Sequence, residues 1–163
     1  MLPCHLPNRP LHPPMPSKTC YNYGVIKQSK WALVHAFGLE LSDGSILSVY
    51  CHWDGYPEFN GVKLQEHFNS YDAAAELIDG GDVSALWTNV GWNNEVLPTT
   101  GPLYYSSRGE GSYPRVDANL NEYLSDGEEY AYLFKDGEWV CYNNRRWDDK
   151  FLQQVEIPVA VAA

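Results

Sequence analysis

The sequence predicts an α+β fold: an antiparallel sheet of two hairpins, with two or three short helices packed on one face. Two pairs of β-branched and aromatic runs each flank a turn signal, and one alanine-rich segment has the caps of a helix. The strand and helix segments do not alternate regularly as they would in a parallel α/β sheet. This order is typical of α+β domains.

The first hairpin is expected between residues 31 and 53, where WALVHAFGLEL and SILSVYCHW flank a Ser-Asp-Gly turn signal. In the following NGVKLQEHF, the apolar residues Val62, Leu64 and Phe68 lie near helical spacing after an Asn-Gly break. We therefore expect the second strand to lead through a turn into a short helix.

The clearest helix is predicted in SYDAAAELIDGG, residues 70–81. Ser70 is a suitable N-cap, Asp72 favours the first turn, and two consecutive glycines follow the last apolar residues. The next segment, DVSALW at residues 82–87, is expected to add one more helical turn.

Residues 88–121 are rich in glycine and proline and are expected to form mainly loops, with PLYYSS as the only strand candidate. The second hairpin is predicted in EYAYLFKDGEWVCYN, where Asp136-Gly137 suits a tight turn. A short amphipathic helix is expected around residues 148–156, because Pro158 would stop it.

The chain divides into a proline-rich N-terminal arm at residues 1–20, a single α+β domain at 21–157 and a short tail at 158–163. Six of the first sixteen residues are proline, so neither a helix nor a sheet ladder is expected in the arm. The two cysteines and two histidines of the arm match no standard zinc-module spacing. We expect no metal and no cofactor.

The composition describes an acidic chain that is rich in aromatic residues. The 163 residues have a formal net charge of -10 and include 6 Trp and 12 Tyr. This charge argues against broad nucleic-acid binding, which needs clustered Lys and Arg. We expect a cytoplasmic protein, because the sequence has neither an apolar run long enough to cross a membrane nor a signal-peptide pattern. The four cysteines are then expected to be free thiols.

The segment DGSILSVYCHWDGYPEFNGVKLQEHF, residues 43–68, resembles a signature of small uncharacterised phage-encoded proteins that share a Y-C-H-W-D-G-Y segment. The resemblance continues more weakly through AAAELIDGGDVSALW, SSRGEG and EYAYLFKDGEWV, and covers about residues 31–142. It implies an accessory protein that acts in the cytoplasm of the infected host cell. It provides no catalytic residue.

The Y-C-H-W-D-G-Y segment contains reactive side chains and has three interpretations. His52 and Asp54, joined by His67 from the following helix, have ligand types that suit zinc or manganese in a hydrolytic site. A nucleophilic Cys51 would need a histidine partner, but strand alternation separates it from His52. The third interpretation is a structural corner, since Asp-Gly, Tyr-Pro and Asn-Gly steps all favour changes of direction.

A candidate ligand site lies in the loop YYSSRGEGSYPR, where small residues surround Arg108 and precede Arg115. Guanidinium groups and backbone amides of this kind can bind an anion, although the loop lacks the Gly-Lys-Ser/Thr ending of a P-loop. The full set of candidate ligand-binding residues is Arg108, Arg115, Tyr105, Trp53 and Tyr56. Arg145 and Arg146, flanked in sequence by Trp139 and Trp147, form a third candidate patch.

The sequence therefore favours a phage-encoded accessory protein that acts on the host cell by binding rather than by catalysis. It would inhibit a host defence or metabolic protein, or sequester a nucleotide-like signal. The alternative is a small metal-dependent hydrolase or nucleotide-modifying enzyme that uses His52, Asp54 and His67. No membrane partner is expected, and self-association into a homo-oligomer is left open.

Overall fold

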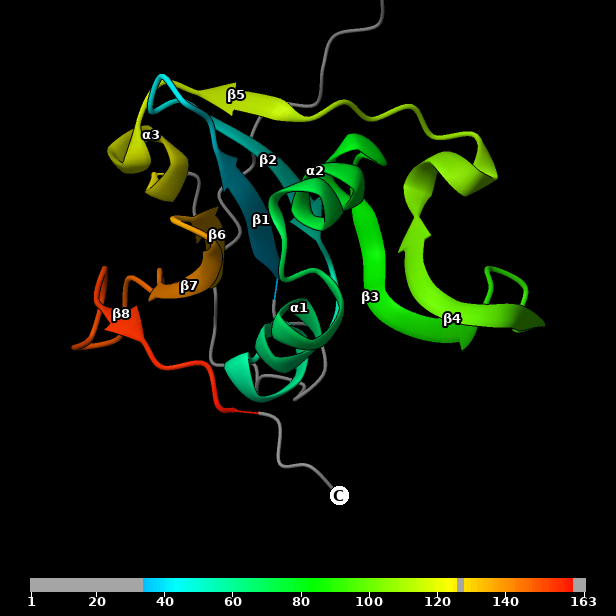
Figure 1. The fold of residues 1–163 in the computed structure, drawn as a ribbon. Coiled ribbons are helices and arrows are strands. Elements are labelled where there is room, and N and C mark those ends of the chain that lie inside the picture. Colours follow the sequence, from blue (N-terminus) through cyan, green and yellow to red (C-terminus); the bar gives the residue numbers. More distant parts are fainter. Residues whose placement is uncertain (1–33, 126–127, 160–163) are drawn as a thin grey trace, which may run out of the picture.

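The computed structural model describes residues 34–125 and 128–159, in which eight strands form one sheet. The strand order is β4-β3-β2-β1-β6-β7-β8, and β5 pairs with β2 outside this path (Figure 1). The strands are β1 (His35–Glu40), β2 (Ile46–Cys51), β3 (Val83–Val90), β4 (Val96–Tyr104), β5 (Arg115–Asp117), β6 (Tyr130–Lys135), β7 (Glu138–Asn143) and β8 (Gln154–Val155). The arm predicted for residues 1–20 lies outside the described residues.

The α+β class is confirmed, but the expectation of an antiparallel sheet is wrong. The pairs β1–β2, β3–β4 and β6–β7 are antiparallel, whereas β1 pairs parallel with β6, and β2 pairs parallel with β3. Local turn signals act only between consecutive strands. The parallel contacts join segments that are distant in sequence, so the turn signals gave no information about them.

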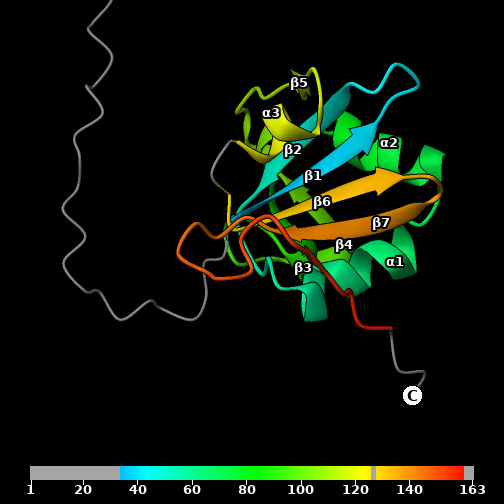
Figure 2. The ribbon, with the colours of Figure 1, turned by 90° about the vertical axis from the view of Figure 1, so that its left-hand side faces the viewer.

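Helices cover both faces of the sheet, contrary to the predicted arrangement on one face. The helices are α1 (Val62–His67), α2 (Tyr71–Asp79) and α3 (Leu120–Leu124), with a π-helical turn η1 (Pro57–Gly61) and a 3₁₀ turn η2 (Tyr105–Arg108). Figure 2 shows α1 and α2 on one side of the central strands and α3 on the other. Every residue of β1 and β6 except the last is buried, so both faces of these strands need a cover.

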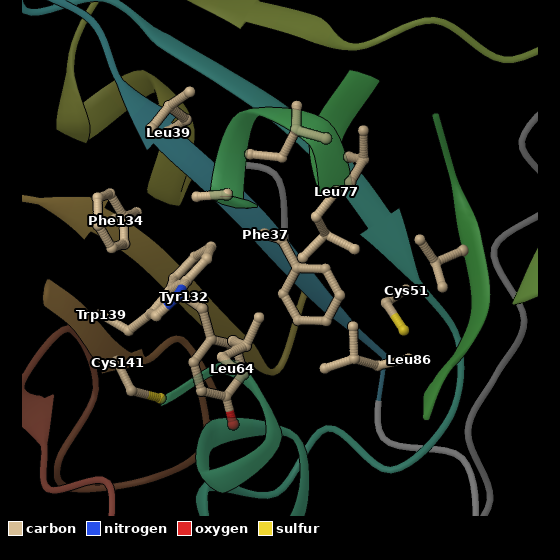
Figure 3. Packing of buried hydrophobic residues seen from close by; sticks show 14 of the residues in the cluster. Phe37, Leu39, Cys51, Leu64, Leu77, Leu86, Tyr132, Phe134, Trp139 and Cys141 are labelled. Atoms are coloured by element: carbon tan, nitrogen blue, oxygen red, sulfur yellow. The ribbon is translucent and has the colours of Figure 1, made fainter. Parts of the chain in front are cut away.

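The larger core lies under α1 and α2 (Figure 3). It joins Phe37 and Cys51 of the central strands to Leu64 of α1 and Leu77 of α2. A smaller core under α3 contains Ile46, Tyr123 and Leu133 among others. Burial of these apolar side chains on both faces is the main driving force for the fold.

The predicted helices at residues 62–68 and 70–81 are confirmed as α1 and α2. Ser70 caps α2 as expected, because its Oγ accepts a hydrogen bond from the Ala73 amide at 3.2 Å. Gly80 follows the last helical residue, and the ring of Tyr104 occupies the place where a Cβ of residue 80 would lie. The glycine is therefore needed for close packing between the end of α2 and β4.

Two helix predictions are wrong. DVSALW lies mostly in β3, because Val83–Val90 pairs with β4. Val83 and Leu86 are both buried in the core, on either side of a register shift in this pairing. Residues 148–156 form turns and β8, in which Val155 pairs with Cys141 of β7. In both cases pairing with the neighbouring strand along the chain overrides the local helix propensity.

The loop-rich segment at 88–121 contains more regular structure than expected. PLYYSS spans the end of β4 and the start of η2, and β4 itself extends over nine residues from Val96. Two further short elements, β5 and α3, follow in the region that was expected to be loop. None of the helices in residues 34–125 and 128–159 has the length and apolar character needed to cross a membrane.

Candidate functional site

The Y-C-H-W-D-G-Y segment forms a corner between β2 and η1. The strand ends at Cys51, after which the amides of His52 and Trp53 donate hydrogen bonds to the carbonyls of Val83 (3.1 Å) and Ser84 (3.0 Å) on β3. Asp54 then adopts a left-handed backbone conformation with φ of 64°, which reverses the chain direction. These contacts support the structural interpretation of the segment.

Asn60 lies at the centre of the corner and is fully buried. Its Nδ2 donates to the Trp53 carbonyl at 2.9 Å and lies 2.7 Å from Nε2 of His35 on β1. From the opposite side, the buried hydroxyl of Tyr132 donates to the Gly55 carbonyl at 2.7 Å. Two buried side chains thus fix the corner by satisfying its carbonyl groups.

Cys51 is part of the core and is unsuited to nucleophilic catalysis. Its side chain lies among those of the larger core cluster (Figure 3), and its Sγ lies 3.9 Å from the Trp53 carbonyl. Burial raises the pKa of the thiol strongly, which suppresses the thiolate that a nucleophile requires. Cys141 is also a buried free thiol, and burial raises its pKa to about 12.

The structure gives His52, Asp54 and His67 separate surroundings. The Nδ1 of His52 lies 2.5 Å from the Tyr50 hydroxyl, whereas the ring of His67 stacks on Trp87 of β3 at 3.7 Å between centroids. Since β2 ends before His52, the strand alternation assumed for residues 52–54 does not apply. Within residues 34–125 and 128–159, no group of three or more His, Cys, Asp or Glu side chains is placed to hold a metal ion.

The predicted arginine loop forms an aromatic cluster in which Arg108 is exposed and Trp92 and Tyr105 are half-buried. The guanidinium of Arg108 lies 4.0 Å from the ring centre of Trp92 and 5.1 Å from that of Tyr105, and its Nε forms an ion pair with Glu110 at 2.5 Å. The indole of Trp92 donates to Ser107 Oγ, which in turn donates to the Tyr104 carbonyl. The guanidinium of Arg108 is therefore held next to two aromatic rings by cation–π contacts and by the ion pair with Glu110.

Trp92 was not among the residues selected from the sequence. It lies in the turn between β3 and β4, and its ring lies 5.3 Å from that of Tyr105, which follows β4. The strand register does not explain this contact, because the residue paired with Tyr104 is Val83 at the other end of the hairpin. No spacing pattern in the sequence would therefore have identified the pair.

Asp82 joins the arginine loop to the corner. Its Oδ1 accepts a hydrogen bond from the Tyr50 amide at 2.9 Å, and its carbonyl accepts one from the Tyr105 amide at 3.1 Å. On the corner side, the ring of His52 lies between Tyr50 and Trp53, with centroid distances of 6.0 and 4.6 Å. Burial, and to a smaller extent nearby Tyr105, raise the pKa of Tyr50 to about 12.

These residues make up the candidate site, which we call the aromatic–arginine surface. It consists of two groups: Trp92, Tyr105 and Arg108 from the loop, and Tyr50, His52 and Trp53 from the corner. Among its members, Trp53 and the Arg108 side chain are about 40% exposed. The surface therefore offers planar rings and one cation to a ligand.

The other predicted ligand-binding residues have different settings. Arg115 lies on β5, where its guanidinium contacts Ser48 Oγ (3.2 Å) and Asp117 Oδ2 (3.3 Å). Tyr56 is half-buried, and its carbonyl accepts the Phe59 amide at the start of η1. We assign both residues to the scaffold on these contacts.

The prediction of a third patch around Arg145 and Arg146 is wrong in one residue, Trp139. Arg145 forms an ion pair with Asp148 at 2.5 Å and lies over Tyr130, and Trp147 is exposed nearby in sequence. Trp139, however, is buried in the larger core and donates to the Phe68 carbonyl at 2.8 Å. It does not flank the arginines.

A scan of the sequence against protein-family models gave no match, and neither a search of curated proteins nor a search of solved structures found a similar protein.

Proposed function

We propose that this chain is a phage-encoded accessory protein that acts in the infected cell by binding a host protein through the aromatic–arginine surface. The phage origin rests on the sequence resemblance around residues 43–68. The binding role rests on one structural observation: Trp92, Tyr105 and Arg108 pack together at the surface, where Arg108 is exposed and both rings are half-buried. Trp, Tyr and Arg are the residue types that dominate binding energy at protein interfaces.

Charge favours a protein over a nucleotide as the ligand. From residue 34 onward the sequence contains 7 Lys and Arg against 21 Asp and Glu, a formal charge of 7 − 21 = −14. A phosphate group would approach against this charge, and Arg108 already pairs with Glu110. A host protein surface with basic and apolar groups meets no such repulsion.

A nucleotide-like signal remains the second candidate, because one observation favours it. The guanidinium of Arg108 lies 4.0 Å from the ring centre of Trp92, so the cluster combines aromatic rings for a base with a cation for a phosphate. Such a ligand must displace Glu110 from the guanidinium. Native mass spectrometry of protein purified from infected cells tests this candidate directly, since a retained nucleotide adds a defined mass.

The host-protein proposal is tested by affinity capture from infected cells with two matched double variants. Trp92→Ala with Arg108→Ala removes the cluster, whereas Trp147→Ala with Arg146→Ala removes an exposed Trp and Arg elsewhere. We expect a stoichiometric host protein with the wild type and with the second variant, and its loss with the first. Equal capture by both variants would overturn the proposed surface.

A separate experiment tests the enzymatic alternative. A hydrolase or nucleotide-modifying enzyme based on His52, Asp54 and His67 would turn over an added nucleotide and would lose this activity on Asp54→Ala. The separate partners of His52 and His67 favour binding over catalysis. Turnover by the purified chain that Asp54→Ala abolishes would replace the binding proposal.

A further inference from the structure

An apolar groove lies between α2 and the tip of the β1–β2 hairpin, built from other residues than the aromatic–arginine surface. Its volume is about 420 Å³, and its lining includes the partly buried Leu41, Leu47 and Ala75 together with the buried Leu39 and Ile78. Tyr71, at the first position of α2, is about half exposed beside it. The helix and the hairpin thus leave apolar surface in contact with water.

Acidic side chains surround this groove. Glu76 and Asp79 line it from α2. An adjoining hollow of about 560 Å³ shares Leu41 and Tyr71 and adds Glu40 and Asp136, with Lys135 as its one cation. None of these four carboxylates forms an ion pair with another residue in the described ranges. The rim therefore has an uncompensated negative charge.

We propose that this groove binds a segment of a partner protein in which apolar side chains are flanked by Lys or Arg. Apolar side chains in the groove would be removed from water at about 25 cal/mol per Å². The flanking cations would compensate the carboxylates, which otherwise lose hydration when a partner covers them. This inference depends on the proposed function in one respect, namely that the chain acts by binding a protein.

Two other occupants of the groove must be considered. Charge disfavours a second copy of the chain, whereas residues 1–33 must be distinguished by experiment. A second copy of the chain would present the same acidic surface from residue 34 onward and would be repelled. Residues 1–33 differ, because they contain Arg9, Lys18, Lys27 and Lys30 and no Asp or Glu. This segment of the chain itself is therefore the main competitor for the groove.

The test is an NMR titration of the isotope-labelled full chain with two synthetic peptides of about 15 residues that differ only in charge. One has leucines at helical spacing with lysines between them, and the other has glutamates in place of the lysines. We expect the lysine peptide to shift the amides of Leu41, Leu47 and Ala75–Asp79, and to bind at least about tenfold more tightly. Raising the salt to about 0.5 M should weaken it.

Two double variants with the same change in net charge distinguish binding of the peptide to the groove rim from its general attraction to an acidic protein. Glu76→Gln with Asp79→Asn changes the rim, and Glu58→Gln with Glu156→Gln makes the same change in net charge at exposed positions elsewhere. We expect severalfold weaker binding of the lysine peptide with the first pair only.

Equal loss with both pairs, equal binding of the two peptides, or shifts confined to other residues would overturn the proposal. Two further results would also overturn it. Groove amides that shift with salt but not with peptide would assign the groove to residues 1–33. Groove amides that shift with protein concentration but not with peptide would assign it to a second copy of the chain. The titration needs no host partner. Its failure would therefore leave the aromatic–arginine surface untouched, and failed partner capture would leave the groove untouched.

Discussion

The corner at residues 51–60 and the loop at residues 104–110 contain similar side chains but use them in opposite ways. In the corner, Asn60 and Tyr132 satisfy backbone carbonyls inside the protein. In the loop, Arg108 packs on Trp92 and Tyr105 at the surface, and its ion pair with Glu110 is exposed. The corner is therefore held by buried hydrogen bonds, whereas the loop keeps Arg108 exposed and its two rings partly exposed.

This difference shows that the density of reactive residues is a poor guide to function. The corner holds the denser cluster in sequence, yet Cys51 is in the core and the two histidines of the metal hypothesis have unrelated partners. The loop holds fewer reactive residues, but they remain in contact with solvent. Substitutions in the two regions should therefore affect stability and binding separately.

The largest effect on stability is expected for Asn60→Ala. The change removes the donor to the Trp53 carbonyl and the buried contact between Asn60 Nδ2 and His35 Nε2. We expect a loss of about 2–3 kcal/mol in the free energy of unfolding, measured by urea denaturation. A loss below about 0.5 kcal/mol would show that the corner does not depend on Asn60.

Tyr132→Phe is expected to cost less, about 1 kcal/mol. The ring stays in the core, and only the hydroxyl that donates to the Gly55 carbonyl is lost. Tyr113→Phe is the control, because Tyr113 is 90% exposed and should be neutral in the same urea denaturation measurement. If the two substitutions had equal effects, the Tyr132 hydroxyl would not be fixing the corner.

Arg108→Ala is expected to change the free energy of unfolding by no more than about 0.5 kcal/mol, because exposed ion pairs contribute little. The contact of Arg108 with Trp92 adds a cation–π interaction at the surface. Urea denaturation at low and high salt measures both contributions. A loss above about 2 kcal/mol in the free energy of unfolding would show that the loop stabilises the fold as the corner does, and would contradict the proposed difference between the two regions.

Asp54→Asn should give the smallest effect and one that depends on pH. Burial raises the pKa of Asp54, so the folded state holds this proton more tightly than the unfolded chain. Wild-type stability therefore falls as pH rises from the ordinary Asp range through the raised folded value.

The Asn variant lacks this loss, and Asn tolerates the left-handed backbone at this position. We expect it to equal or slightly exceed the wild type in the free energy of unfolding at pH 7, with no advantage at pH 3. Urea denaturation across this range measures the difference. A variant clearly less stable than the wild type at pH 7 would mean that the charged carboxylate supports the corner.

The sequence predicted those parts of the fold that depend on neighbouring residues. The Ser70 cap, the turn between β1 and β2 and the turn at Asp136-Gly137 all form as expected. The parallel pairing of β1 with β6 could not be predicted, because it depends on contacts about 95 residues apart along the chain. The strand at Val83–Val90 was missed because its partner β4 was expected to be loop.

Only part of the candidate site was predicted, because local patterns identify single residues and not the contacts between segments that are distant in sequence. Tyr105 and Arg108 were selected from the sequence, and Trp53 was selected separately. Asp82 brings the two groups together through hydrogen bonds to Tyr50 and Tyr105. Neither this link nor the contribution of Trp92 follows from local patterns, since both require the pairing of β2, β3 and β4.

The central claim is that the loop group of the aromatic–arginine surface provides most of the binding energy, whereas the buried hydrogen bonds of the corner support the fold. The most direct test is the affinity of the captured host protein for wild-type chain, for Trp92→Ala with Arg108→Ala, and for Tyr132→Phe, measured by calorimetry with unfolding free energies in parallel. We predict at least about thirtyfold weaker binding by the loop variant at nearly unchanged stability, and unchanged binding by the less stable Tyr132→Phe. Wild-type affinity in the loop variant would contradict the account.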